Sequence, residues 1–230
     1  MLRSIFRGAS KTYSVQAERD YYSKSRSDRS ASSYTHLDAY VRGSVGLDFF
    51  RGKSVLDIGC GEGVYSAWIA DRGGAKNVLG IELTDHRIRW EYQERLANLR
   101  FEVADILAHD FGGQQFDIVF FNLVLHHLRF ELPRVGEIVV SSLREGGCLL
   151  AFEPNVYSPL AVLAHLIHSR SANEGFLSPG QIRRSLEQTG MRDISNGFFW
   201  RERRWARNAF LGSSFWLTAR KPALSSRCVG

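Results

Sequence analysis

The sequence predicts an α/β fold in which helices cover both faces of a mainly parallel sheet. Short apolar segments alternate with amphipathic ones from residue 54 to residue 155, and this alternation is typical of βαβ units. Of the 230 residues, 44% are hydrophobic and 23% are charged, which excludes wholesale disorder, collagen and a coiled coil. No apolar run approaches 18 residues, so no transmembrane helix is expected.

The region before the alternation has a different composition. Residues 1–17 hold three basic side chains at helical spacing and no acid, which predicts a basic N-terminal helix, with an organelle-targeting segment as the alternative. Residues 23–33 are rich in Ser and Arg and predict a flexible segment. A helix is expected over residues 35–50.

The middle of the chain contains five short apolar runs with helical patterns between them. The expected strands are 54–59, 77–83, 100–105, 116–125 and 148–155. The expected helices are 64–74, 85–98 and 133–147.

The tail predicts two helices, 159–170 and 178–190, and two strands, 192–200 and 213–221. The helix over 178–190 is the best marked, because Ser178 is a favoured cap and Pro179 a favoured first residue.

The strongest pattern is VLDIGCGEG, residues 55–63, in which an apolar strand is followed by three glycines at alternating positions. Glycine is needed where the backbone turns tightly or approaches a ligand closely. Open α/β sheets bind ligands at this carboxyl edge of the strands. Glu82 ends the next strand, where an acid can accept both ribose hydroxyls of a nucleoside, and Asp105 ends the third.

The glycine spacing distinguishes between cofactors. A dinucleotide site needs G-x-G-x-x-G, and here the third glycine comes one residue too early. Asp57 precedes the glycines and would repel a pyrophosphate, but it suits a ligand with an amine or sulfonium group. An NAD-dependent oxidoreductase is therefore the disfavoured alternative.

Residues 55–63 resemble motif I of class I S-adenosylmethionine-dependent methyltransferases, and Glu82, Asp105 and residues 116–128 fall where the next motifs of that family lie. The resemblance covers about residues 52–155. It implies a Rossmann-like, seven-stranded, mostly parallel sheet with helices on both faces and an antiparallel last strand. The domains it implies are an N-terminal basic helical lid, 1–51, and a methyltransferase domain, 52–230, with a cofactor core over 52–155 and acceptor-side elements over 156–230.

The resemblance also implies a cofactor, S-adenosylmethionine, and a set of residues around it. The glycines would pass along its methionine and ribose parts, Glu82 would hold the ribose, and Asp105 with Ile106 would frame the adenine. The expected cofactor-binding residues are Asp57, Gly59, Cys60, Gly61, Gly63, Glu82, Leu83, Asp105, Ile106, Asn122 and Leu123.

Methyl transfer depends mainly on proximity and orientation, and a base is needed only where the acceptor must lose a proton. The candidates are His126, His127 and Glu153. The alternative for the histidines is capping or packing of the next helix, and the alternative for Glu153 is anchoring of a loop. No set of His, Cys, Asp and Glu has metal-ligand spacing, so no metal site is expected.

The acceptor is expected to be a small or amphiphilic molecule, because Asn122 is not followed by the Pro-Pro motif of base methyltransferases. The lid tyrosines, Tyr21, Tyr22 and Tyr34, would lie near it. Residues 54–155 carry net charge −6, while both flanks are basic, and 200–207 hold four arginines and two tryptophans. Two alternatives follow, an RNA methyltransferase that uses these flanks and a non-catalytic S-adenosylmethionine-binding protein; peripheral membrane contact is a further option.

The three cysteines are far apart and lack CxxC spacing, which favours a reducing, cytoplasmic setting.

Overall fold

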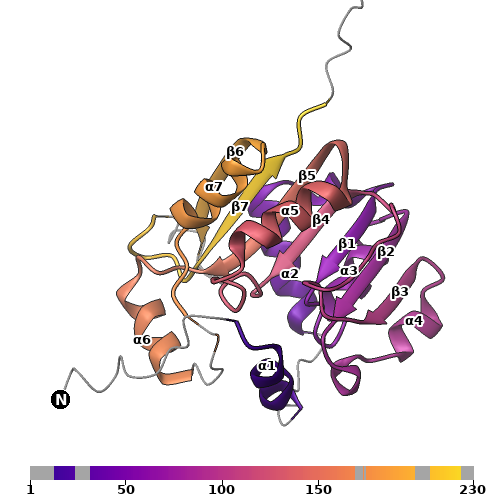
Figure 1. The fold of residues 1–230 in the computed structure, drawn as a ribbon, viewed down its shortest axis with the longest axis horizontal. Helices are drawn as coiled ribbons and strands as arrows, with labels where there is room; N and C mark the ends of the chain where they lie inside the picture. Colours follow the sequence, from indigo (N-terminus) through magenta and orange to yellow (C-terminus); the bar gives the residue numbers. More distant parts are fainter. Residues whose placement is uncertain (1–12, 24–31, 169–172, 174, 200–207, 224–230) are drawn as a thin grey trace, which may run out of the picture.

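The structure, a computed structural model, describes residues 13–23, 32–168, 173, 175–199 and 208–223. A seven-stranded sheet runs through the centre in the order β3-β2-β1-β4-β5-β7-β6 (Figure 1). Its strands are β1 Ser54–Ile58, β2 Asn77–Glu82, β3 Leu99–Val103, β4 Phe116–Asn122, β5 Leu143–Pro154, β6 Arg192–Phe199 and β7 Ser214–Arg220.

The strand directions confirm the predicted sheet. The pairs β1–β2, β1–β4, β2–β3 and β4–β5 are parallel. The last strand, β7, is antiparallel to both of its neighbours, β5 and β6. The carboxyl ends of β1, β2, β3 and β4 therefore meet at one edge of the sheet.

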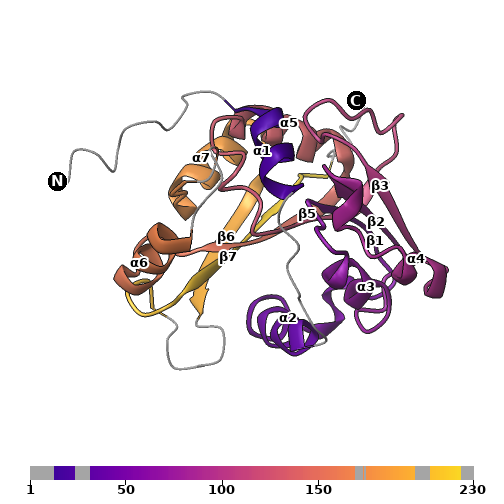
Figure 2. The same ribbon diagram turned by 90° about the horizontal axis from the view of Figure 1, so that it is seen from below.

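Helices cover both faces of the sheet (Figure 2). α2 (Ser32–Ser44), α3 (Val64–Ala70) and a 3₁₀ turn, η2 (Leu47–Phe50), lie on one side, where Phe50, Trp68 and Phe120 belong to a buried core. α5 (Leu132–Ser142) and α7 (Pro179–Gln188) lie on the other and pack over a second core. α6 (Pro159–His168) follows β5 at one end of the molecule.

The expected helix over 85–98 is wrong. The chain forms a 3₁₀ turn, η3 (Asp85–Arg87), and then a short helix, α4 (Glu91–Arg95). Between them Ile88 is extended and buried, and the backbone N–H of Arg89 donates to the carbonyl of Glu62. The loop after β1, residues 59–63, carries the three glycines and is called the glycine loop below. Burial of Ile88 and this contact with the glycine loop prevail over helical propensity.

The helix expected over 133–147 ends at Ser142, and residues 143–147 belong to β5 instead. Leu143 is fully buried and pairs with Phe116 in the sheet, so tertiary packing outweighs the helical pattern there. Most other expected elements appear within a few residues of their expected ends. The helix expected over 35–50, however, ends at Ser44 and is followed by the separate turn η2, and the helix expected over 64–74 ends at Ala70.

A short helix, α1 (Val15–Tyr22), lies beside the carboxyl edge of the central strands (Figure 1). Ser14 caps it, with its hydroxyl accepting from the N–H of Ala17. The expected basic helix over 1–17 falls mostly on residues outside the described structure, and the helix that is described begins later, at Val15.

Candidate functional site

A cavity of about 380 Å³ opens at the carboxyl ends of β1, β2, β3 and β4. This volume lies in the range of small-molecule sites. Most residues expected at the cofactor line it, namely Asp57, Gly59, Cys60, Gly61, Glu82, Leu83, Asp105, Ile106, Asn122 and Leu123, and so do His126 and His127. Gly63 and Glu153 are absent from its lining. Segments up to 70 residues apart are thus brought together at the expected edge.

The glycine loop depends on backbone shapes that other residues adopt with strain. Gly59 and Gly63 have φ of +70° and +76°. A Cβ on Gly59 would lie 2.5 Å from the Val124 side chain, and one on Gly63 would lie 2.2 Å from the Phe101 ring. Gly63 therefore serves the packing of the loop at the start of α3, while Gly59 and Gly61 face the cavity.

Asp57 is buried at the end of β1, where its carboxylate accepts a hydrogen bond of 2.5 Å from the Ser66 hydroxyl. Burial raises the pKa of Asp57 to about 7, the nearby charge of Glu82 adds to this, and the Ser66 hydrogen bond opposes it. A cation bound in the cavity would stabilise the ionised form of this carboxylate.

Glu82 is also buried, and its two oxygens hold the surrounding loops. One accepts from the N–H of Gly61 at 2.9 Å and the other from the Thr84 hydroxyl at 3.4 Å. Each carboxylate oxygen has a further lone pair, so the side chain can accept donors from the cavity as well. Asp105 accepts from the N–H of Leu107, which fixes the turn after β3.

His126, which lines the cavity, forms a buried pair with Glu153, which does not. Nδ1 of His126 lies 2.6 Å from Oε2 of Glu153, and the other oxygen, Oε1, accepts from the backbone N–H groups of Val124 and Leu125. The Glu153 side chain is fully buried. It therefore anchors the loop after β4 and orients His126.

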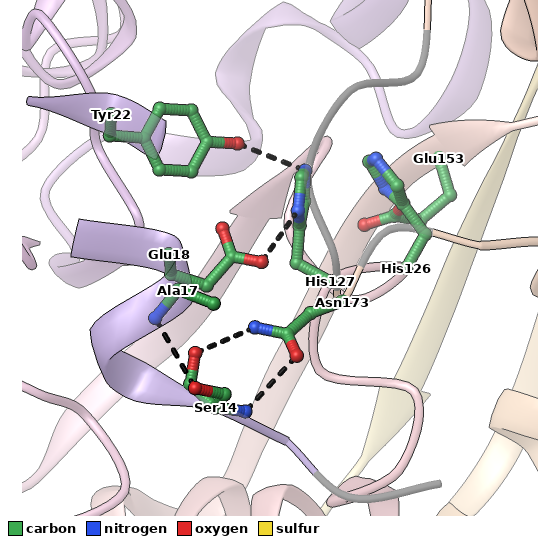
Figure 3. Close-up of polar contacts among 8 residues, drawn as sticks. All are labelled: Ser14, Ala17, Glu18, Tyr22, His126, His127, Glu153 and Asn173. Atoms are coloured by element: carbon green, nitrogen blue, oxygen red, sulfur yellow. Dashed lines mark hydrogen bonds and ion pairs between the residues drawn. The ribbon is translucent and has the colours of Figure 1, made fainter. Parts of the chain in front are cut away.

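His127 lies between two side chains of α1 (Figure 3). Its Nε2 is 3.0 Å from the Tyr22 hydroxyl, and its Nδ1 is 3.5 Å from Oε1 of Glu18. Glu18 is 2% exposed and lines the cavity together with Tyr22. A carboxylate, an imidazole and a phenol are thus connected in a row at the cavity wall.

Asn173 holds the start of α1 in place (Figure 3). Its amide oxygen accepts from the N–H of Ser14 at 3.0 Å, and its amide nitrogen donates to the Ser14 carbonyl at 2.8 Å. The Asn173 side chain is fully buried. These two bonds join segments 159 positions apart and fix the helix that carries Glu18 and Tyr22.

The sequence analysis did not name several of the cavity residues, among them Tyr13, Glu18 and Arg87. The guanidinium of Arg87 lies 4.3 Å above the Tyr22 ring, which holds the ring against the wall. No motif marks these residues, because their role arises from contacts across the chain. Tyr21 and Tyr22, two of the tyrosines expected near the acceptor, line the cavity.

Two sets of side chains expected near the acceptor lie outside the part of the chain that the structure describes. The basic aromatic group Trp200, Arg201, Arg203, Arg204, Trp205 and Arg207 is outside the described residues, and the Tyr34 side chain is not described. Within the described ranges no three His, Cys, Asp or Glu side chains are arranged to hold a metal ion. No helix among these ranges has the length and apolar character needed to cross a membrane.

Comparison with known proteins agrees with this geometry. A family model described as a methyltransferase domain matches residues 55–147, which include the glycine loop, Glu82, Asp105 and both histidines. This match identifies residues 55–147 as a methyltransferase domain. This methyltransferase domain resembles the crystal structure of a SAM-dependent methyltransferase from Archaeoglobus fulgidus, with a TM-score of 0.66, 17% identity, and coverage of 82% of this chain and 94% of that one.

One sequence relative and one further structure of similar fold have named activities. Trans-aconitate 2-methyltransferase of Deinococcus radiodurans is 32% identical over 120 residues, which cover 52% of this chain and 44% of that protein. The match thus spans less than half of that relative. Phosphoethanolamine N-methyltransferase 2 of Haemonchus contortus, solved with S-adenosyl-L-methionine, has a TM-score of 0.61 and 18% identity, with 82% of this chain and 52% of that one covered.

Proposed function

We propose that this chain binds S-adenosylmethionine and transfers its methyl group to a small molecule. The carrying observation is the cavity at the ends of the parallel strands, which gathers Asp57, Glu82 and Asp105 around the glycine loop. Among the described residues the lining holds five acids and one arginine. This set suits a cofactor with a sulfonium, an ammonium and ribose hydroxyls better than one with a pyrophosphate.

Different residues of the cavity would contact different parts of the cofactor. Glu82 would accept the ribose hydroxyls with the lone pairs that Gly61 and Thr84 leave available, and Asp105 with Ile106 would border the adenine. Asp57 and the backbone of Gly59 and Gly61 would face the methionine end. When bound, S-adenosylmethionine supplies a methyl group that is already electrophilic.

The chain's own contribution is orientation and proton removal. Bringing acceptor and methyl together in line can lower the barrier by roughly 7–11 kcal/mol. His127 is the proposed base, because its Nε2 meets the Tyr22 hydroxyl at the cavity wall. His126 is the second candidate, with Glu153 as a positioning residue that fixes its ring.

Calorimetric titration of the protein with S-adenosylmethionine and S-adenosylhomocysteine tests the proposal. We expect micromolar binding of both, and loss of at least tenfold in affinity for Glu82→Ala, since each 1.4 kcal/mol is tenfold. Glu94→Gln, which changes an exposed acid on α4, is the matched control and should bind normally. A folded wild-type protein that binds neither compound at millimolar concentration would refute the proposal, and preferential binding of NADH would favour an oxidoreductase.

A further inference from the structure

Two chemically different groups of residues line the cavity. Asp57, Glu82 and Asp105 lie at the ends of β1, β2 and β3, where the proposed cofactor sits. The second group comes from the N-terminal segment and the loop after β4, with Tyr13, Glu18, Tyr21, Tyr22, His126 and His127. This second group, the acceptor end, is where an acceptor would meet the methyl group.

The acceptor end contains a buried carboxylate. Glu18 is 2% exposed, so its carboxylate is shielded from bulk water. The lining contains Arg87 as its one Lys or Arg among the described residues, and its guanidinium stacks on the Tyr22 ring. The Glu18 carboxylate would repel a carboxylate or phosphate acceptor placed beside it and would attract a cation.

Aromatic rings complete this end. Tyr13, Tyr21 and Tyr22 line the cavity, and the rings of Tyr21 and Tyr22 meet edge to face at 4.9 Å. Burial, with the charges of Glu18, Asp105 and Glu82, raises the pKa of Tyr13 well above its usual range, so this phenol is neutral. Neutral aromatic faces beside a buried carboxylate are a typical environment for an ammonium group.

We propose that the acceptor is a small amine whose ammonium form is held by Glu18 and the tyrosine rings. The proposal rests on the proposed function and names its substrate class. The proposed reaction depends on the connected side chains of Glu18, His127 and Tyr22, which Figure 3 shows.

The same row accounts for the proton that an ammonium must lose. Nε2 of His127 takes a proton from the Tyr22 hydroxyl as that hydroxyl takes one from the ammonium, and Glu18 beside Nδ1 stabilises the imidazolium that forms. The free nitrogen lone pair then attacks the methyl carbon, the carbon–sulfur bond breaks, and its electron pair stays on sulfur. The amine becomes a methylated ammonium while the sulfonium becomes a neutral thioether, so charge is conserved.

The test compares matched ligands on protein loaded with S-adenosylhomocysteine. Benzylamine, benzyl alcohol and benzoate share a ring, and ethanolamine, ethylene glycol and glycolate form a smaller set. We expect at least one amine to bind at least tenfold more tightly than its alcohol and its carboxylate. Binding of a carboxylate more tightly than its amine, or binding of neither amine, overturns the proposal.

Two variants on the same helix make the test specific to Glu18. Glu18→Gln should abolish the preference for amines and keep the affinity for S-adenosylhomocysteine within about threefold of wild type. Asp20→Asn, at an exposed acid on α1, should keep both. An amine preference that survives Glu18→Gln contradicts the proposal, whereas failure of S-adenosylhomocysteine to bind the wild type contradicts the proposed function instead.

Discussion

The carboxylate of Glu153, at the end of β5, accepts the backbone N–H groups of the loop after β4 and lies 2.6 Å from Nδ1 of His126. One fully buried side chain therefore holds both the loop and a histidine that faces the cavity. Parallel pairing of β4 with β5 places the two strand ends side by side, which makes this contact possible.

Removal of this carboxylate should be costly. Glu153→Ala would leave the N–H groups of Val124 and Leu125 and Nδ1 of His126 without their partner. We expect a loss of about 3–5 kcal/mol in the free energy of unfolding, measured in urea. Glu153→Gln should lose less, since its amide oxygen can still accept. Glu145→Gln, at an exposed acid on the same strand, should change the value by about 0.5 kcal/mol or less. Equal stability of Glu153→Ala and wild type would show that the loop does not depend on this carboxylate.

Asn173 should control the docking of α1. Asn173→Ala removes both hydrogen bonds to the Ser14 backbone, each worth about 1 kcal/mol. We expect hydrogen exchange of the amides in Val15–Tyr22 to accelerate about tenfold or more. Ser14→Ala keeps these two bonds and loses only the cap to Ala17, so its effect should be smaller. Unchanged exchange in Asn173→Ala would mean that other contacts hold the helix.

Asp57 should make stability depend on pH. Its pKa is about 7 in the folded protein and near its ordinary value, 3.8, when unfolded. Between these values the folded state keeps a proton that the unfolded state releases, so this group's contribution to stability falls as pH rises from about 4 to about 7. The slope approaches about 1.4 kcal/mol per pH unit.

Asp57→Asn should remove that slope, because the amide does not titrate. Urea unfolding of both proteins at pH 5 and pH 7.5 measures it: the wild type should lose stability relative to the variant over this interval. Parallel curves for the two proteins would indicate that Asp57 is ionised throughout.

Gly63→Ala tests whether the third glycine is required by packing. Two penalties are expected, a positive φ and a methyl group 2.2 Å from the Phe101 ring. Gly112 has a similar φ of +57° with nothing near its Cβ position, so Gly112→Ala isolates the first penalty, about 1 kcal/mol. We expect Gly63→Ala to lose at least about 2 kcal/mol more in urea unfolding. Equal losses in the two variants would exclude the steric contribution of Phe101.

The sequence predicted the parallel sheet and the cofactor side of the cavity because both follow from local patterns. Residues 55–63 place their own glycines, and Glu82 and Asp105 each end a strand that can be recognised by its apolar run. On the proposed acceptor side the sequence analysis named Tyr21, Tyr22, His126 and His127, but it missed Glu18 for a physical reason. Glu18 and His127 meet through packing of α1 on a loop more than a hundred residues away, and no periodicity encodes that contact.

The sequence analysis also missed two interruptions, one in the helix expected over 85–98 and one in the helix expected over 133–147, for a related reason. Ile88 is extended because it is buried and its neighbour Arg89 bonds to Glu62, and Leu143 joins the sheet because it pairs with Phe116. Both are effects of tertiary structure on segments whose local pattern favours a helix.

The attachment of α1 has a consequence for the redesign of this protein. The N-terminal residues of the proposed acceptor end, Tyr13, Glu18, Tyr21 and Tyr22, all lie within residues 13–22, a segment short enough to exchange as a cassette. The sheet and glycine loop are built from other residues, and Asn173 anchors the cassette through the main chain of Ser14. A library confined to these ten positions could therefore be screened for new acceptors while cofactor affinity serves as the constant reference.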